Sequence, residues 1–154
     1  MQDDIRFMRE ALKSAKKAFD LDETPVGAVI TLDGKIIARG YNLRETSQDP
    51  TQHAEMIAIR KAARKIGGWR LNECDMYVTL EPCPMCAGAI IQARLRNLIF
   101  GAADPKAGAA GSVVDLFTVE KFNHKVNVTS GILADECGGI LKEFFRQRRK
   151  IKSK

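Results

Sequence analysis

The sequence has no long apolar run and no dense set of cysteines, and both absences narrow its class. No stretch approaches the roughly 20 apolar residues of a membrane-spanning helix, and the first residues lack the apolar core of a secretory signal. Four cysteines in 154 residues, without a dense spacing pattern, argue against a disulfide scaffold. Long repeats, linkers and low-complexity stretches are also missing. We therefore expect one cytoplasmic domain over residues 1–154, without a membrane-bound part.

What the sequence does contain is a globular composition with an excess of positive charge. Hydrophobic residues make up 45% of the chain and charged residues 29%, which is enough apolar material for a buried core. The net charge of +6 suits an anionic partner without identifying one. Residues 144–154 combine Phe144 and Phe145 with many basic side chains. A solvated helix end is the simple explanation, but cations beside aromatic rings also fit phosphate attraction and base stacking.

Two segments, centred on residues 53 and 83, carry the residue types that bind metals. Glu55 follows His53 by two positions, and two residues separate Cys83 from Cys86. Two such thiolates and one imidazole can bind a tetrahedral zinc ion, and a catalytic site leaves the fourth position for water. The spacing His-x-Glu with Pro-Cys-x-x-Cys is the pattern of zinc-dependent nucleobase deaminases. We therefore expect His53, Cys83 and Cys86 as ligands and Glu55 as an unbound carboxylate.

Two other interpretations of the cysteine pair stay open. A Cys-x-x-Cys pair at a helix start can be a redox pair, but this leaves His53 and Glu55 without a role. A structural zinc site would need a fourth protein ligand, for which Cys74 is the candidate. The strand-like run 76–80 separates Cys74 from Cys83 at about 3.3 Å per residue, which favours an open site.

An open zinc site with a free carboxylate supports hydrolytic deamination. Zinc lowers the pKa of a bound water towards about 7. We expect Glu55 to take a proton from that water, to deliver it to a purine ring nitrogen and then to help protonate the departing ammonia. Because it carries protons, Glu55 cannot also be tied to the metal.

Periodicity and turn signals predict a sheet with helices on both faces. Helices are expected over residues 3–19, 51–66, 84–95 and from about 133, and five strands over 26–31, 35–40, 76–80, 97–100 and 125–129. Thr51 is the predicted N-cap of the second helix, and Pro84 suits the first turn of the third. Gly138 and Gly139 weaken the last helix locally. The order and direction of the strands stay open.

Further segments resemble bacterial tRNA adenosine deaminases over nearly the whole chain. They are Pro25 to Val29, Asp49 to Thr51 with His53 to Glu55, Val78 to Cys83 with Met85 to Ala89, Phe100 to Ala102, Asp104 with Lys106, Gly108 to Ser112, and Phe144 to Arg146 with Arg148 and Arg149. The zinc motif alone also fits cytosine or guanine deaminases, whereas the Gly/Ala-rich loop and the Phe-Phe-Arg segment favour the tRNA enzymes. Gln52 departs from the family, which more often has a small residue there.

The resemblance implies a cytidine-deaminase-like fold, a three-layer α-β-α arrangement with a mixed five-stranded sheet. It also implies a homodimer with one Zn²⁺ per subunit, in which both subunits contact RNA. The implied reaction converts adenosine to inosine at the wobble position of a tRNA anticodon, with the anticodon stem-loop as partner. By matching positions, the implied substrate contacts are Asn42, Ala54, Asp104, Lys106, Asn123, Phe145 and Arg149.

Three functions therefore remain in competition. The first is a tRNA adenosine deaminase, and the second is a deaminase of free purine or cytosine bases, which would not need a phosphate-binding C-terminal end. The third is a non-enzymatic RNA-binding module with a structural zinc, which would need Cys74 as a fourth ligand.

Overall fold

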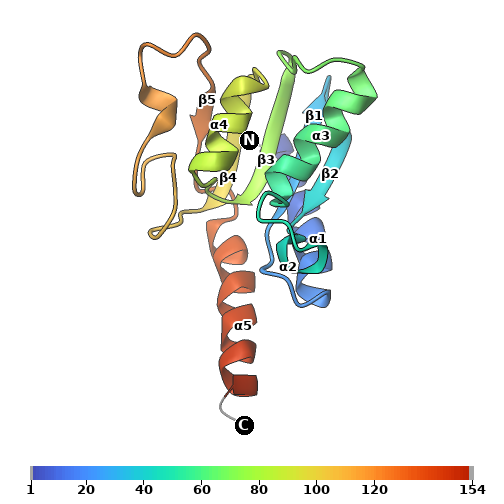
Figure 1. Ribbon diagram of the computed structural model, residues 1–154, viewed down its shortest axis with the longest axis vertical. Helices are drawn as coiled ribbons and strands as arrows, with labels where there is room; N and C mark the ends of the chain where they lie inside the picture. Colours follow the sequence, from blue (N-terminus) through green and yellow to red (C-terminus); the bar gives the residue numbers. More distant parts are fainter. Residues whose placement is uncertain (1, 153–154) are drawn as a thin grey trace.

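The computed structural model describes residues 2–152, which form a five-stranded sheet between two layers of helices (Figure 1). Met1, at the start of the expected domain, and Ser153 and Lys154, at the end of the expected basic segment, lie outside the described residues. The helices are α1 (Gln2–Asp20), α2 (Arg44–Ser47), α3 (Ala54–Ile66), α4 (Pro84–Gln92), the 3₁₀-helix η1 (Leu116–Thr118) and α5 (Ala134–Lys152). The strands are β1 (Gly27–Leu32), β2 (Lys35–Tyr41), β3 (Cys74–Leu80), β4 (Asn97–Ala102) and β5 (Asn127–Thr129).

The strand order is β2-β1-β3-β4-β5, and the sheet is mixed. β1 pairs antiparallel with both β2 and β3, whereas β3, β4 and β5 run parallel. The segment β3-α4-β4 is therefore a crossover unit, as parallel neighbours require a long connection. The predicted five-stranded sheet with helices on both faces is confirmed.

Alternate residues of the central strands face two separate cores, because side chains in a strand point to opposite faces. On one face, Ile30, Met76 and Leu98 pack with apolar residues of α3 and α4. On the other face, Tyr77 and Ile99 pack with residues of α1 and α5. α3 and α4 thus lie together on one face of the sheet, where both can contribute to a single site (Figure 1).

The start of α3 differs from the prediction. Its N-cap is His53, in extended backbone, and not Thr51. The Thr51 N–H and hydroxyl both donate to the Asp49 carboxylate, at 2.9 and 2.7 Å, so that the capping side chain is used in the preceding turn. Consequently Glu55 is the second residue of the helix, and His53 lies directly before the first residue, at the N-terminal end.

The other helix ends also show where tertiary context prevails over local signals. α4 begins at Pro84 as predicted, but it ends at Gln92 and not at Leu95, because Arg94 adopts a φ of 64°. α5 continues through Gly138 and Gly139, since Cys137 and Phe144 are buried on either side of them. Within residues 2–152, no helix combines the length and the apolar character that a bilayer crossing requires.

Gly27 is where α1 packs directly against the sheet. A Cβ at this position would lie 2.1 Å from the Ala11 carbonyl oxygen and 2.4 Å from the Ala15 nitrogen. Both atoms belong to the backbone of α1, so a side chain could be admitted only by moving the helix. The absence of a side chain at Gly27 therefore fixes the distance between α1 and β1.

We expect Gly27→Ala to lower the free energy of unfolding by about 1–3 kcal/mol, as overpacked core positions do. The measurement is denaturant-induced unfolding. The matched control is Gly139→Ala in α5, where an added Cβ has nothing within 4 Å; better helix propensity should stabilise that variant by up to about 1 kcal/mol. Equal stability of the two variants would contradict the close packing at Gly27.

Candidate metal centre and catalytic pocket

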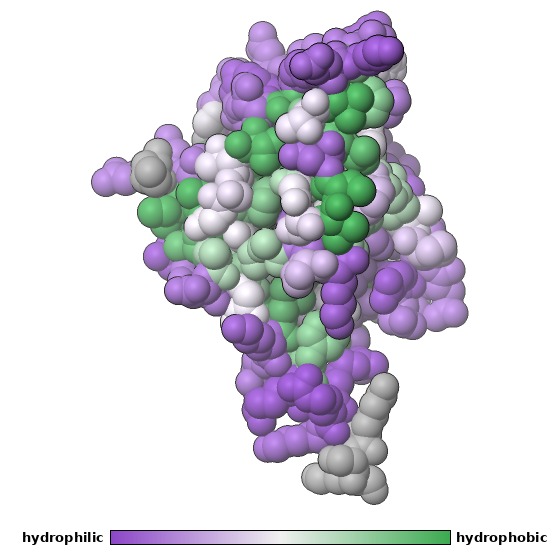
Figure 2. Space-filling view, turned by 90° about the vertical axis from the view of Figure 1, so that its left-hand side faces the viewer, coloured by the Kyte–Doolittle hydropathy of each residue, from purple (hydrophilic) through white to green (hydrophobic). Residues whose placement is uncertain are grey.

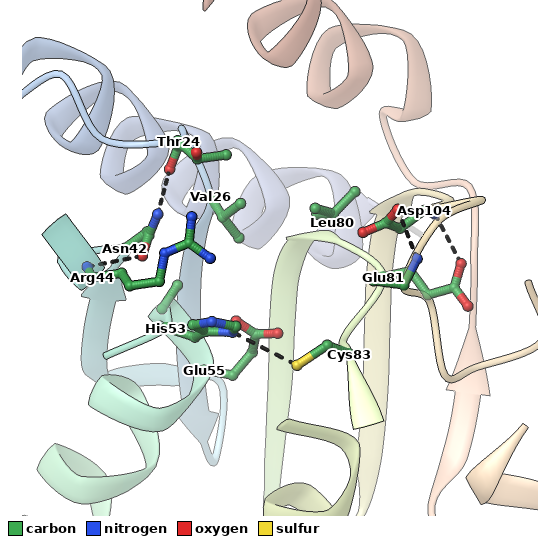
Figure 3. A pocket seen from close by; sticks show the side chains of 12 residues that line it. Thr24, Val26, Asn42, Arg44, His53, Glu55, Leu80, Glu81, Cys83 and Asp104 are labelled. Atoms are coloured by element: carbon green, nitrogen blue, oxygen red, sulfur yellow. Dashed lines mark hydrogen bonds between the residues drawn. The ribbon is translucent and has the colours of Figure 1, made fainter. Parts of the chain in front are cut away.

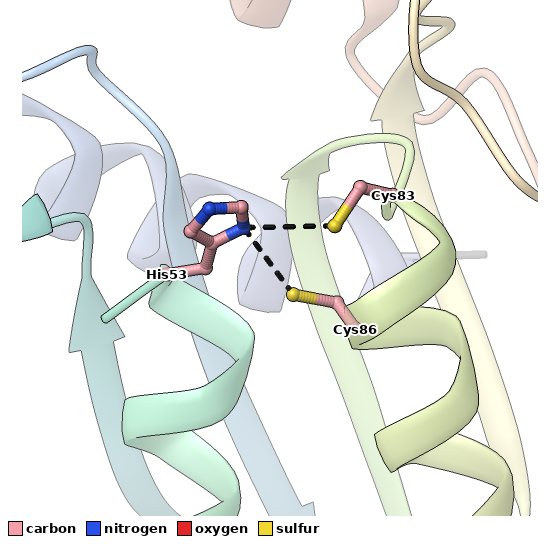
Figure 4. A group of neighbouring side chains, drawn as sticks. All are labelled: His53, Cys83 and Cys86. Carbon is pink, nitrogen blue, oxygen red and sulfur yellow. Dashed lines mark hydrogen bonds between the residues drawn. The ribbon is translucent and has the colours of Figure 1, made fainter. Parts of the chain in front are cut away.

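His53, Cys83 and Cys86 come together where α3 and α4 begin (Figure 4). His53 is the N-cap of α3, Cys83 is the N-cap of α4, and Cys86 lies in the first turn of α4. His53 Nδ1 is 3.7 Å from Cys83 Sγ and 3.5 Å from Cys86 Sγ. Both helix N-termini therefore face the group, and the positive ends of the helix dipoles favour thiolates there.

The donor set and its spacing fit one tetrahedral metal ion. Bonds of about 2.1 Å to nitrogen and 2.3 Å to sulfur, as in tetrahedral zinc sites, separate such ligands by roughly 3.6 Å. The observed separations of 3.7 and 3.5 Å agree with this value. A hydrogen bond from Cys86 lowers the pKa of Cys83 to about 4, and the same bond raises the pKa of Cys86. The arrangement of the group thus favours a thiolate at Cys83.

Glu55 lies beside the metal group without belonging to it. Among the described residues, the atoms that could hold the ion come from His53, Cys83 and Cys86. Glu55 is 4% exposed, and burial raises the pKa of its carboxyl group to about 7. A carboxyl group that changes protonation state near neutral pH is suited to proton transfer.

Cys74 does not approach the metal group. It is buried at the first residue of β3, whereas Cys83 follows the last residue of that strand. Its thiol belongs to the apolar core, where burial raises its pKa. Within residues 2–152, the site therefore offers three protein ligands and not the four of a closed structural site.

A hollow of about 200 Å³ opens beside these residues (Figure 3). Its lining comprises Thr24, Val26, Asn42, Arg44, His53, Ala54, Glu55, Leu80, Glu81, Cys83, Asp104 and Ala107. Asn42 and Arg44 approach from one side, and Glu81 and Asp104 approach from the other. His53, Glu55 and Cys83 lie between them. The volume is smaller than the about 300–1,000 Å³ typical of drug-sized ligands, which suits a single base.

The predicted substrate contacts fall into three separate places. Asn42, Ala54 and Asp104 line the catalytic pocket. Lys106, Phe145 and Arg149 meet in a second hollow together with Arg148. Asn123 lines a third hollow, beside Gly88, Gln92 and Arg94 of the α4 region.

Asn42 is buried, and its amide is already engaged in the pocket wall. Its Nδ2 donates to the Thr24 carbonyl at 3.2 Å, and its Oδ1 accepts from the Arg44 N–H at 3.2 Å. An amide nitrogen carries two N–H groups, so one donor remains for a ligand. Asn42 therefore both builds the wall and retains a group that can face a substrate.

The sequence reasoning missed Arg44 and Glu81, which also line the pocket. Arg44 begins the short helix α2, which was not predicted. Glu81 is 2% exposed, and burial alone would raise its pKa. Hydrogen bonds from Ser112 and from backbone N–H groups instead hold that pKa below its usual value, so the group is a carboxylate. The sequence feature that could have identified Glu81 is its position directly before Pro82 and Cys83, at the end of a buried strand.

The comparison with known proteins agrees with this site. Residues 2–149 match the MafB19-like deaminase family. A tRNA-specific adenosine deaminase from Bacillus subtilis is 51% identical over 152 residues, which covers 99% of this chain and 94% of the relative. The chain belongs to the tRNA-specific adenosine deaminase family. The predicted resemblance is thereby confirmed, and the redox and non-enzymatic interpretations give way to a deaminase.

Solved structures place this member of the tRNA-specific adenosine deaminase family among similar folds. A structure from a study of A-to-I editing by tRNA:A34 deaminases has a TM-score of 0.85 and 47% identity, and covers 88% of this chain and 99% of that chain. A guanine deaminase from Bacillus subtilis has a TM-score of 0.61 and 35% identity, and covers 74% of this chain and 83% of that chain. The fold is thus shared with a free-base deaminase, but the likeness to the tRNA enzyme is greater.

We expect Cys83→Ser to lose most of the bound metal, because it removes one of three ligands. Cys74→Ser should keep the metal content of the parent protein, because that thiol lies at the far end of β3. Metal content per chain, measured by inductively coupled plasma mass spectrometry, checks both. Loss of metal from the Cys74 variant, with the fold intact by circular dichroism, would restore the four-ligand structural site.

Proposed function

We propose that the protein is a zinc-dependent deaminase that converts adenosine to inosine at the wobble position of a tRNA anticodon, with release of ammonia. The observation that carries the proposal is the buried, unligated Glu55 beside a three-ligand metal group in a base-sized pocket. The names of the related enzymes support the choice of tRNA adenosine as substrate. One zinc ion per subunit would be held by His53, Cys83 and Cys86.

The proposed reaction is a substitution by water at C6 of adenine. When bound, zinc supplies an activated water molecule at neutral pH. Glu55 accepts a proton as the water oxygen bonds to C6, and it delivers this proton to ring nitrogen N1. Glu55 then helps transfer the remaining proton of the new C6 hydroxyl group to the amino nitrogen. The bond between C6 and that nitrogen breaks as the C6 carbonyl forms, and the amino group leaves as ammonia. Adenosine and water thus become inosine and ammonia.

The surroundings of the pocket suit an RNA substrate whose target base is flipped out. Asn42, Ala54 and Asp104 would contact the base or its ribose, since they line the pocket. Lys106, Phe145 and Arg149 would contact the flanking nucleotides, in the adjoining hollow. The Phe145 ring is 45% exposed and so is available for base stacking. A single-stranded anticodon loop lowers the cost of extruding the base. The location that we propose for the enzyme is the cytoplasm.

We further propose that the enzyme works as a homodimer. Asn123 does not line the catalytic pocket of its own chain, so a role in substrate binding fits better with the RNA held by a second subunit. The side of the molecule seen in Figure 2 carries apolar residues among hydrophilic ones. Val113, Val114 and Phe122, in the segment between β4 and β5, are large, apolar and exposed. Exposed apolar surface of this kind is what a partner subunit would cover.

We expect the purified protein to form inosine in an anticodon stem-loop with adenosine at the wobble position. Free adenine should remain unchanged, because it lacks the ribose and the flanking nucleotides that the pocket and the second hollow would bind. The measurement is nucleoside analysis by mass spectrometry. A stem-loop with its only adenosine in the paired stem is the control. Deamination of free adenine without turnover of the stem-loop would favour a free-base deaminase.

Glu55→Ala should lower turnover of the stem-loop by about 10²–10⁴-fold, the range for loss of a positioned acid–base group. Its zinc content should match that of the parent protein, because Glu55 is not among the candidate ligands. Glu73→Ala, at an exposed position just before β3, is the control and should leave both quantities unchanged. A Glu55 variant that lost its zinc would instead make this residue a ligand.

A further inference from the structure

We propose that Glu81 is a positioning residue that holds residues 104–112, the substrate loop, in place against the catalytic pocket. The inference rests on the proposed function and deepens it, because it assigns the structural basis of substrate binding to one carboxylate. Glu81 itself is not required to touch the base. It acts through the loop that it anchors.

The Glu81 carboxylate accepts hydrogen bonds from three points along the substrate loop. Its Oε1 accepts from the Asp104 N–H at 3.0 Å and from the Ser112 hydroxyl. Its Oε2 accepts from the Ala110 N–H at 2.9 Å and from the Ser112 N–H at 3.1 Å. The residue is 2% exposed, so that these donors replace water as its partners. One carboxylate therefore fixes the two ends of the loop.

The close approach of Gly108 to Glu81 is a second observation that the loop packs directly against this carboxylate. A Cβ at this position would lie 2.3 Å from the Glu81 carboxyl carbon and 2.4 Å from each of its oxygens. The backbone of the middle of the loop thus touches the carboxylate that binds its ends. The Ala109 N–H donates to the Pro82 carbonyl at 2.8 Å, which adds a fixed point next to Gly108.

The substrate loop carries residues of both proposed subsites. Asp104 and Ala107 line the catalytic pocket, whereas Lys106 lines the second hollow with Phe145 and Arg149. The Asp104 carboxylate also accepts from the N–H groups of Lys106 and Ala107, at 3.0 and 3.2 Å, so these three residues form one unit. A shift of the Asp104 backbone would therefore move the wall of the catalytic pocket together with Lys106, the proposed contact to a flanking nucleotide.

Replacement of the carboxylate by an amide is the sharpest test. In Glu81→Gln, one acceptor oxygen becomes an NH₂ donor that faces N–H groups of the loop, and buried donors without acceptors are unfavourable. The size and shape of the side chain stay the same. Any effect thus reports the loss of hydrogen bonds and not the creation of a cavity.

Three measurements on the zinc-loaded protein distinguish a loop anchor from other roles. For Glu81→Gln we expect faster amide hydrogen exchange in residues 104–112, an unchanged zinc content and a KM for the anticodon stem-loop raised about tenfold, as loss of about 1.4 kcal/mol of binding implies. The kcat should fall less than the KM rises, because Glu55 and the metal ligands stay in place. Ser112→Ala removes one donor and keeps the carboxylate, so it should show the same changes to a smaller degree and tests the proposal even if the Glu81 variant fails to fold.

The control is Asp75→Asn on the same strand. Asp75 lies at the opposite end of β3, where its carboxylate accepts from Arg96 and Asn97. This variant should lower the melting temperature while it leaves the KM and the exchange of residues 104–112 unchanged.

Parent-like exchange and KM in both the Glu81 and Ser112 variants would overturn the proposal. Loss of zinc from Glu81→Gln would also overturn it, because the residue would then act on the metal centre. If the parent protein did not deaminate the stem-loop, the proposed function would fail and the substrate role of Glu81 with it, whereas the exchange data would still decide whether Glu81 holds the loop.

Discussion

The chemistry of this protein depends on the convergence of two helix N-termini on one face of the sheet. α3 is held against β2 at Gly40, where a Cβ would lie 2.4 Å from the Ala54 carbonyl oxygen, at the start of α3. α4 is held by its place in the crossover between the parallel strands β3 and β4. Because both helix starts are held in this way, the side chains of His53, Cys83 and Cys86 approach one another, with His53 Nδ1 at 3.5–3.7 Å from the two sulfur atoms. Regular structure thus sets the geometry of the metal group.

The two walls of the pocket are organised differently, since they are formed by a short helix, α2, on one side and by a loop on the other. Glu23, which is 1% exposed, accepts from the N–H groups of Glu45 and Thr46, at 3.1 and 2.5 Å, and so holds the segment that carries Arg44. Glu81 holds the substrate loop on the opposite side. A buried carboxylate accepts several N–H bonds at once, and charge-assisted bonds are stronger than neutral ones. Hydrogen bonds from backbone N–H groups to these two buried carboxylates therefore hold the two segments, and Glu55 lies between them (Figure 3).

The grouping of His53, Cys83 and Cys86 could be predicted from the sequence because each half of the motif is local in the chain. His53 and Glu55 are neighbours on one helix start, and Cys83 and Cys86 are neighbours on another, so their spacing alone indicates ligands and a carboxylate. The five strands could be placed for the same reason. Boundaries were less secure: Thr51 has the chemistry of an N-cap, but its hydroxyl binds Asp49 of the preceding turn. Arg94 likewise ends α4 through a backbone conformation that no side-chain pattern indicated.

What the sequence by itself determined is thus the family, together with the grouping of His53, Cys83 and Cys86. Only the tertiary structure decided that Cys74 lies away from the metal, that Asn123 stands apart from the catalytic pocket, and that Arg44 and Glu81 belong to it. The physical reason is the range of the contacts involved. Each half of the candidate ligand motif spans only a few consecutive residues. The hydrogen-bond partners of Glu81, in contrast, lie 23 to 31 positions further along the chain. They approach Glu81 only when β3, β4 and the following loop have packed together.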